Sequence, residues 1–366
     1  MASAELAVIG GGVVGMALAC GLLRNGLKVT VFDGGDSDLR ASRGNFGLIW
    51  VQGKGDTLPD YARWTRQSAA LWPDFADTLH QATGIDLQLS QRGGMYICLD
   101  QEELDQRKRM LQALREKLAG DYPFEVMDRP ALARYIPAIG PEVAGATFCA
   151  EDGHVNPLSL LRALHTFFER FGGRLINGVH IEDIQTRNGV FRLTSGRESW
   201  KSDKLVLAAG LGNLSLAPKV GLEIPLRPNR GQVMIGERVP PFLHYPTGHV
   251  RQTAEGTVQL GDSQEDVGFD DGTTPEVMAA IARRAVRMFP QLAGVRVIRA
   301  WGALRILSKD GYPVYQESAQ CPGAYVVTCH SGVTLAASHE GPLADWIAGT
   351  ANPPGLQVFS GERFYV

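Results

Sequence analysis

Cysteine is scarce in this 366-residue sequence, and no two thiols are spaced as a redox pair or a metal site requires. The five cysteines are Cys20, Cys98, Cys149, Cys321 and Cys329. An odd number of distant cysteines argues against a disulfide framework, a zinc site and a resident iron–sulfur cluster. We therefore expect reduced thiols, no metal site and a cytoplasmic location.

The sequence also lacks a large excess of charge of one sign, and it lacks long apolar runs. The formal net charge is −3 and no basic cluster occurs, so nothing points to nucleic acid. The apolar stretch 13–23 contains Gly15 and Gly21 and is too short to cross a bilayer. No basic region and cleavage signal resembling a secretory leader precede it. We expect no transmembrane segment and no nucleic-acid partner.

The length and composition are those of a globular protein with more than one domain. Hydrophobic residues make up 44% of the chain and charged residues 20%, without internal repeats or low-complexity segments. A chain of 366 residues exceeds the usual size of a single hydrophobic core, so two domains are expected.

The first thirty-three residues carry the pattern of a dinucleotide-binding βαβ unit. A buried strand over 5–9 leads into a glycine-rich turn and a small-residue helix, and a second strand ends at an acidic residue. Gly10 permits the tight turn, Gly12 lets the backbone approach a pyrophosphate, and Gly15 allows close packing of helix on strand. Asp33 is placed to bind a ribose diol. The pattern alone leaves NAD and FAD equally open. The nucleotide-binding residues predicted here are Gly10, Gly12, Val13, Val14, Gly15 and Asp33.

Several later stretches add specificity because of their order and spacing. They are ASRGNFG at 41–47, DGHVNP at 152–157, LVLAAG at 205–210, RGQ at 230–232, WGALR at 301–305, DGYP at 310–313 and CHSGVTLA at 329–336. The last stretch reads as a small-residue turn that runs straight into a helix.

Together these stretches resemble the D-amino-acid oxidase superfamily of flavoproteins, which includes glycine oxidase and sarcosine oxidase, over nearly the full chain. Within it the sequence resembles in particular the catalytic beta subunits of bacterial D-hydroxyproline dehydrogenases and opine oxidases. The resemblance implies an α/β fold, with a Rossmann-like FAD-binding domain of the glutathione-reductase type and a discontinuous mixed-sheet substrate domain. The implied boundaries are 1–86, 145–222 and 301–366 for the FAD-binding domain, and 87–144 and 223–300 for the substrate-binding domain.

The resemblance also implies an extended, non-covalently bound FAD. Its ADP half would lie on the βαβ unit, and residues 42–47 would run past the pyrophosphate toward the isoalloxazine. The turn at 331–334 would lie beside the flavin pyrimidine edge, where a helix N-terminus stabilises negative charge. His330 either assists there or only caps the helix. The further cofactor residues implied are Ser42, Arg43, Gly44, Asn45, Gly47, Ala209, Gly210, His330, Ser331, Gly332, Val333 and Thr334.

For catalysis the resemblance points to Arg305, His249 and Arg251. Arg305 in the W-x-G-x-R-like stretch would hold the substrate carboxylate through two parallel hydrogen bonds, with a structural salt bridge as the alternative. His249 stands where relatives carry a tyrosine facing the substrate. It would recognise a polar group of the substrate, with Arg251 as a partner, unless both side chains face outward.

The electron acceptor is a further point on which this sequence departs from sarcosine oxidase. That enzyme carries a lysine over the flavin where this chain has Gln259. Without a cation there, the negative charge of superoxide is less stabilised as oxygen reacts with the flavin. This favours a dehydrogenase that passes electrons to a partner.

The implied function is FAD-dependent oxidation of a D-amino acid or an N-substituted amino acid, such as D-hydroxyproline or an opine. A hydride would pass from Cα–H to flavin N5. The chain would be the catalytic subunit of a hetero-oligomer with a larger flavoprotein subunit and an iron–sulfur subunit. The alternatives are a self-sufficient oxidase that produces hydrogen peroxide and a flavin-bearing electron-relay subunit.

Overall fold

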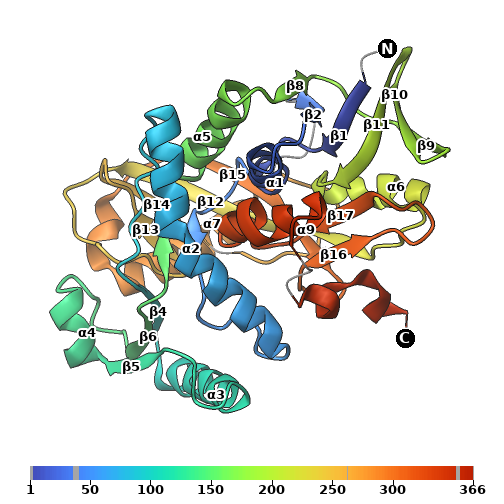
Figure 1. Ribbon diagram of the computed structural model, residues 1–366. Coiled ribbons are helices and arrows are strands. Elements are labelled where there is room, and N and C mark those ends of the chain that lie inside the picture. The colour runs from blue at the N-terminus through green and yellow to red at the C-terminus, as the bar shows by residue number, and fades with distance from the viewer. Residues whose placement is uncertain (1–2, 36–40, 262, 352–354, 366) are drawn as a thin grey trace.

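A mainly parallel sheet, with strands drawn from both ends of the chain, organises the molecule (Figure 1). The computed structural model describes residues 3–35, 41–261, 263–351 and 355–365. The main path of the sheet runs β16-β17-β11-β1-β2-β8, and β10 and β9 extend from β11 as an antiparallel hairpin. Strands β17, β11, β1, β2 and β8 pair in parallel, as in a Rossmann-like fold. The strands of this sheet are β1 (Ser3–Ile9), β2 (Val29–Asp33), β8 (Arg174–Asn177), β9 (Asp183–Arg187), β10 (Val190–Ser195), β11 (Glu198–Leu207), β16 (Val314–Glu317) and β17 (Ala324–Thr328).

The predicted βαβ unit is confirmed in its details. Helix α1 (Val13–Arg24) follows β1 and is buried along almost its whole length, because it lies between the sheet and the helices α5 and α9 (Figure 1). A Cβ on Gly15 would lie 2.0 Å from the Gly10 carbonyl oxygen, so only glycine permits this approach. Gly10 itself has φ +113°, a conformation that other residues rarely adopt.

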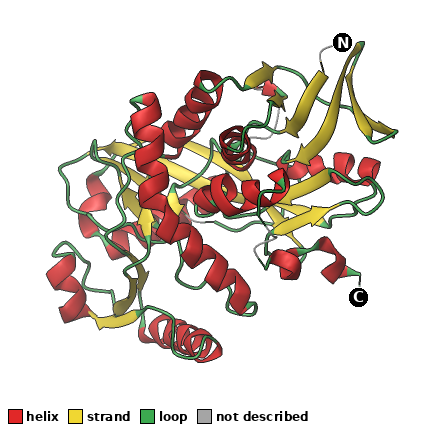
Figure 2. Cartoon of the chain, in the orientation of Figure 1, coloured by secondary structure: helices red, strands yellow, loops and turns green. Residues whose placement is uncertain are grey.

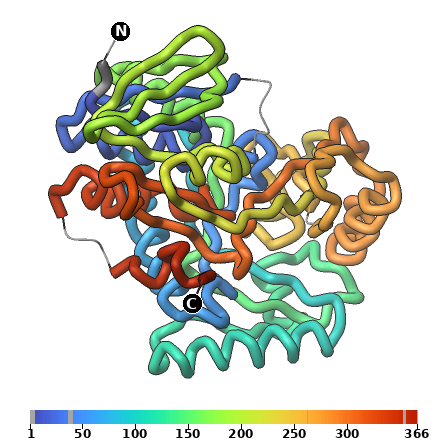
Figure 3. Tube along the Cα trace, turned by 90° about the vertical axis from the view of Figure 1, so that its right-hand side faces the viewer, coloured from blue at the N-terminus to red at the C-terminus, as the bar shows by residue number. Residues whose placement is uncertain are grey.

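A second, antiparallel sheet with the order β13-β14-β12-β15 lies beside the first. Its strands are β12 (Leu226–Arg238), β13 (Val250–Gln252), β14 (Thr257–Leu260) and β15 (Val297–Ser308). Helix α7 (Pro275–Met288) packs on it through Ile281, Ala285 and Met288. Figure 3 shows this gold-to-orange part on one side of the molecule and the green hairpin of the parallel sheet at the top.

Two smaller sheets connect these layers. Strands β4 (Gly94–Cys98), β6 (Gly145–Cys149) and β5 (Glu125–Asp128) form an antiparallel sheet, and β3 (Leu48–Ile49) pairs with β7 (Gly153–His154). Figure 2 shows the helices packed around the strands. The remaining helical segments are α2 (Pro59–Thr83), α3 (Gln101–Lys117), α4 (Arg129–Tyr135), α5 (Pro157–Arg170), η2 (Gly210–Gly212), α6 (Asn213–Leu216), η3 (Ala217–Val220), η4 (Pro290–Gly294), α8 (Ala336–Ser338), η5 (His339–Leu343), α9 (Ala344–Ala348), η6 (Leu356–Phe359) and η7 (Gly361–Phe364). None of the helices in the described ranges is long and apolar enough to cross a membrane.

The predicted helix after the 331–334 turn differs from a regular α-helix. It consists of the short helix α8, a π-helical turn η5 and then α9. Gly341 has φ −91° and ψ −107°, and Pro342 follows it without an N–H to donate. This glycine–proline pair interrupts the α-helical ladder and bends the segment.

Candidate active site

The amino end of α1 presents unpaired backbone amides to a cavity. Gly12 is the N-cap residue and has no side chain to satisfy those amides. The Val13 amide instead donates to Ser42 Oγ at 3.0 Å, from a segment 29 residues away. Such a helix end favours an anionic group such as a pyrophosphate.

Asp33 lies at the carboxyl end of β2, next to this helix end. Its Oδ2 accepts a hydrogen bond from the Gly11 amide at 2.7 Å and its Oδ1 accepts one from the Gly35 amide at 3.0 Å. The side chain is therefore fixed at the rim of the cavity, as the ribose-binding prediction requires.

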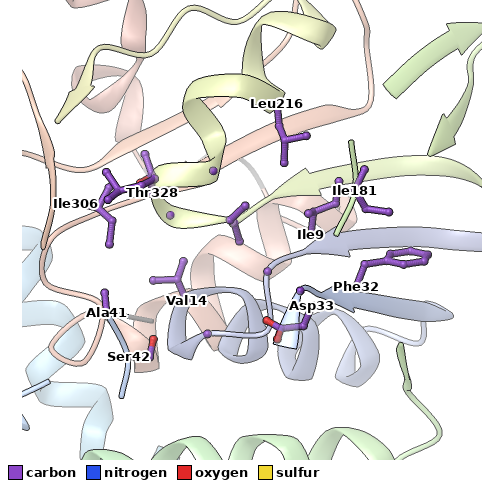
Figure 4. A pocket seen from close by; sticks show the side chains of 18 of the residues that line it. Ile9, Val14, Phe32, Asp33, Ala41, Ser42, Ile181, Leu216, Ile306 and Thr328 are labelled. Carbon is purple, nitrogen blue, oxygen red and sulfur yellow. The ribbon is translucent and has the colours of Figure 1, made fainter. Parts of the chain in front are cut away.

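The cavity beside these residues has a volume of about 350 Å³. Asp33 and Phe32 lie at one end, and Ile306 and Thr328 lie at the other (Figure 4). Among the predicted cofactor residues, those that line it are Gly10, Gly12, Val14, Asp33, Ser42, Arg43, Ala209 and Gly210.

The sequence prediction missed part of this lining. Val179, His180 and Ile181 border the cavity, because the Val179 amide bonds to the Asp33 carbonyl at 3.0 Å. Sequence reasoning could have found these three residues because they follow β8, which pairs in parallel with β2 and therefore ends at the same edge of the sheet.

The segment 44–47 continues from Ser42 across one face of the four-stranded sheet. A Cβ on Gly44 would lie 2.3 Å from the Ala303 Cβ, and a Cβ on Gly261 would lie 3.3 Å from the Phe46 ring. Gly47 has φ +83°, and its amide donates to Asn45 Oδ1 at 2.6 Å. The close approach to Ala303 explains why glycine occupies position 44.

The turn at 331–334 is attached to the chain around β3 and α2. Ser331 Oγ accepts hydrogen bonds from Lys54 Nζ at 2.9 Å and from the Tyr61 hydroxyl at 3.0 Å. Thr334 Oγ1 accepts one from the Trp50 amide at 3.1 Å. The sequence prediction missed Lys54, whose ammonium group adds a positive charge to this turn.

His330, Arg305 and Lys54 form one group around this turn. Burial lowers the pKa of His330 well below its usual range, and the charges of Lys54 and Arg305 lower it further, so the imidazole is neutral. Arg305 Nη1 donates to Asn229 Oδ1 at 3.1 Å and to the Ser263 carbonyl at 2.7 Å. The Arg305 guanidinium extends over Gly231, where a Cβ would lie 2.4 Å from Nη2.

His249 belongs to a different group of side chains. Its ring lies edge-on to Tyr96 with 5.4 Å between centroids, and Arg107 lies over the same Tyr96 ring at 4.3 Å. Burial, and next the charge of Arg284, lower the pKa of His249 to about 4. The imidazole is therefore uncharged at neutral pH.

Arg251 faces the interior, so the outward-facing alternative is wrong. Only 3% of the residue is exposed, and Nε donates to Gln259 Oε1 at 2.7 Å. A cation thus lies directly beside Gln259, which contradicts the expectation that the position of the sarcosine oxidase lysine lacks a nearby positive charge.

A buried carboxylate holds the segment between β3 and Lys54. Asp152 Oδ1 accepts from the Val51 and Gln52 amides at 2.5 and 3.2 Å, and Oδ2 accepts from Gln52 Nε2 at 2.7 Å. Burial raises the pKa of Asp152 to about 7 despite these bonds.

Several observations fit a bound flavin nucleotide. In the part of the chain that the structure describes, three buried polar atoms near the far end of the cavity and the turn have no hydrogen-bond partner: Trp301 Nε1, Thr328 Oγ1 and His330 Nδ1. Glycine at positions 12 and 44 lets Ser42 Oγ and the Ala303 Cβ lie 2.9 and 2.3 Å from where a Cβ would stand, so the segment that begins at Ser42 packs closely on α1 and β15. Cys329 lines the cavity, and burial raises the pKa of its thiol to about 12, so it is uncharged. The described ranges contain no group of three or more His, Cys, Asp or Glu side chains suited to a metal.

Comparisons with known proteins agree with this geometry. The family model described as FAD dependent oxidoreductase matches residues 5–340. The chain is 42% identical to the B subunit of the opine oxidase of Agrobacterium tumefaciens, covering all of this chain and 99% of the relative. It is 39% identical to the B subunit of the opine oxidase of Rhizobium meliloti, with 100% and 98% coverage. Among solved structures, glycine oxidase from Geobacillus kaustophilus superposes with a TM-score of 0.91 at 22% identity, covering 98% of each chain, which supports the fold.

Proposed function

Since the chain belongs to the family of FAD dependent oxidoreductases, we propose that it is the catalytic subunit of a dehydrogenase that oxidises an opine or a related N-substituted or D-amino acid. The observation that carries the proposal is the full-length similarity to the two opine oxidase chains, at 42% and 39% identity. The proposed reaction class is oxidation at CH–NH or CH–NH₂.

FAD would be held by residues that the structure already brings together. The α1 amides and Ser42 would face the pyrophosphate, and Asp33 would face the ribose. FAD supplies the hydride acceptor, N5, for the substrate Cα–H. We propose non-covalent attachment, because the thiol of Cys329 beside the cavity is neutral and therefore a poor nucleophile.

Arg305 would hold the substrate carboxylate. Its Nη1 donates to Asn229 and to the Ser263 carbonyl, and these bonds fix the orientation of the guanidinium. A guanidinium grips a carboxylate through two parallel hydrogen bonds and so orients the Cα–H. The neutral His330 next to it can accept a hydrogen bond from the substrate amine, which a protonated imidazole could not do.

Each of these two bacterial relatives is named as one subunit of an opine oxidase, which supports a hetero-oligomer for this chain. We propose a larger flavoprotein subunit and an iron–sulfur subunit as electron acceptors.

An anaerobic titration tests the proposal. The FAD-loaded protein is mixed with a panel of opines, hydroxyprolines and D-amino acids while the flavin absorbance is followed, and air is then admitted. Bleaching by an opine with slow recovery in air is the expected result. Recovery within one turnover would instead identify a self-sufficient oxidase, and the absence of bleaching by every member of the panel would exclude an amino-acid dehydrogenase.

A further inference from the structure

Two buried arginines of the four-stranded sheet differ in how their charges are balanced. Arg230 and Arg251 are each only 3% exposed. Arg230 forms ion pairs with Glu265 at 2.7 Å and Asp270 at 2.5 Å. Among the residues that the structure describes, no carboxylate forms an ion pair with Arg251, although a buried charge ordinarily requires one.

The hydrogen bonds of Arg251 are all to neutral groups. Nε donates to Gln259 Oε1 at 2.7 Å, and Nη1 donates to the Val155 carbonyl at 2.7 Å and lies 3.3 Å from His154 Nδ1. Nη2 makes no hydrogen bond within the described ranges. Burial lowers the pKa of Arg251 to about 10, which leaves the guanidinium charged at neutral pH. Burial, with Arg251 nearby, lowers the pKa of His154 to about 3, so its imidazole is neutral as well.

The surroundings of Arg251 place this charge on the cofactor side of the sheet. Arg251 is paired with Gln259, and Gly261 lies two residues further along, directly after β14, where its amide still bonds to the His249 carbonyl, so the three share one face. The segment 44–47 crosses that face: Phe46 contacts Gly261, and a Cβ on Gly47 would lie 3.1 Å from Arg251 Nη1.

The same segment connects Arg251 to both ends of the proposed cofactor site. Just before it, Ser42 caps α1 next to the cavity, and just after it, the Trp50 amide donates to Thr334 of the 331–334 turn. Arg230 lies on the opposite face of β12, since its neighbours Asn229 and Gly231 pair with Arg305 and Ala303.

We propose that Arg251 balances the negative charge that the flavin ring acquires on reduction and so raises the electron affinity of the bound FAD. A hydride brings two electrons and one proton to the ring, which gains one negative charge. The exposed Glu255 acts on Arg251 only through its charge and forms no ion pair with it, so the reduced ring would supply the adjacent counter-ion that this buried cation lacks. The proposal depends on FAD binding but not on the identity of the substrate.

Sulfite binding measures this effect without any amino-acid substrate. Sulfite adds to N5 of oxidised flavin and leaves one negative charge on the ring, so its Kd reports how well the protein stabilises that charge. In Arg251→Gln, which removes the charge, we expect the sulfite Kd to rise tenfold or more and the flavin midpoint potential to fall. Arg251→Lys keeps the charge and should stay near the wild-type Kd.

Two further variants make the test decisive. Arg230→Gln removes an equally buried but paired cation from the other face, and we expect lower stability with an unchanged sulfite Kd. His154→Glu leaves Arg251 in place and brings a carboxylate to its Nη1 side, so it should weaken sulfite binding even if Arg251→Gln fails to fold. A sulfite Kd within twofold of wild type in both Arg251→Gln and His154→Glu would overturn the proposal.

The outcomes separate this proposal from the proposed function. If Arg251→Gln keeps the wild-type sulfite Kd but needs far more opine for bleaching, Arg251 binds a substrate carboxylate and the flavin assignment is wrong. If no opine or amino acid bleaches wild-type protein while sulfite binding still depends on Arg251, the substrate assignment fails and the flavin assignment stands.

Discussion

At the scale of single residues, Arg305 is the side chain on which substrate binding is expected to depend most. We predict that Arg305→Lys raises the KM for the true substrate by about 10- to 100-fold, because an ammonium replaces two parallel hydrogen bonds by one point contact. Steady-state kinetics with the compound that bleaches the flavin would measure this change. Arg299→Lys, an exposed position on the same strand, is the matched control and should leave KM unchanged. An unaltered KM in Arg305→Lys would show that Arg305 is structural.

Asp152 should make stability depend on pH. Its folded-state pKa of about 7 lies above the ordinary value of 3.8, so the folded protein holds this proton more tightly than the unfolded chain. The stabilisation linked to that proton is complete below pH 3.8 and is lost as pH rises through 7, at about 1.4 kcal/mol per unit of pKa difference.

Asp152→Asn removes this titration. We predict that the difference in unfolding free energy between wild type and Asp152→Asn is larger at pH 5 than at pH 8, measured by urea unfolding at both values. A difference that is equal at the two values, or larger at pH 8, would show that the carboxyl is ionised at both.

The residue scale is also where sequence reasoning reached least far. Gly10, Gly12 and Asp33 follow a fixed local motif, so their places were predictable and the structure confirms that they meet at one cavity. Lys54 carries no motif, because its position depends on side-chain packing between segments far apart in the chain. Arg251 was named from the resemblance as a partner of His249, but its burial without an ion-paired carboxylate became visible only in the structure.

At the scale of elements, the capping of α1 by Ser42 offers a clear test. Ser42→Ala removes the acceptor of the Val13 amide, and we expect it to cost about 1 kcal/mol of stability and to weaken FAD binding several-fold. Fluorescence titration of the FAD-depleted protein would measure the Kd. Ser159→Ala, in the first turn of α5 where Asn156 already caps the helix, should leave the Kd unaltered. A Kd unaffected by Ser42→Ala would mean that the segment 41–47 does not contribute to the cofactor site.

Elements with a local sequence signal were predictable, whereas the helical segment interrupted at Gly341 and Pro342 was not. An Asn–Gly pair is the typical signal of a two-residue hairpin turn, and Asn188 and Gly189 both have the positive φ that such a turn requires, at 52° and 74°. A helix was expected directly after the 331–334 turn, but the Gly341–Pro342 pair divides this segment into short pieces. The domain boundaries stay a prediction, and β15 (Val297–Ser308) runs across the one expected at residue 301.

At the scale of the whole molecule, the cofactor is expected to contribute to stability. Residues from β1, β2, β15 and β17 and from the turn that follows β11 border one cavity, so a bound FAD would contact segments from much of the chain. We predict that removing FAD lowers the Tm and that adding it back raises the Tm in proportion to the logarithm of its concentration, by about 2.7 kcal/mol of stability at 100 times Kd. Thermal unfolding at a series of FAD concentrations checks this. ADP should give part of the effect, and a Tm that does not respond to FAD would argue against a preformed site.

The distance along the chain between the two halves of the cofactor site affects biosynthesis. Gly10 to Asp33 leave the ribosome early, but the stretch from Val327 to Thr334, which borders the cavity and forms the adjoining turn, is made roughly 300 residues later. At typical synthesis rates of about 5–20 residues per second, the nascent chain exists for roughly 15–60 s with only the nucleotide half of its site. FAD can thus occupy its whole site only after the 331–334 turn has been made, and flavin shortage in the cell would leave folded but unliganded protein exposed to proteases.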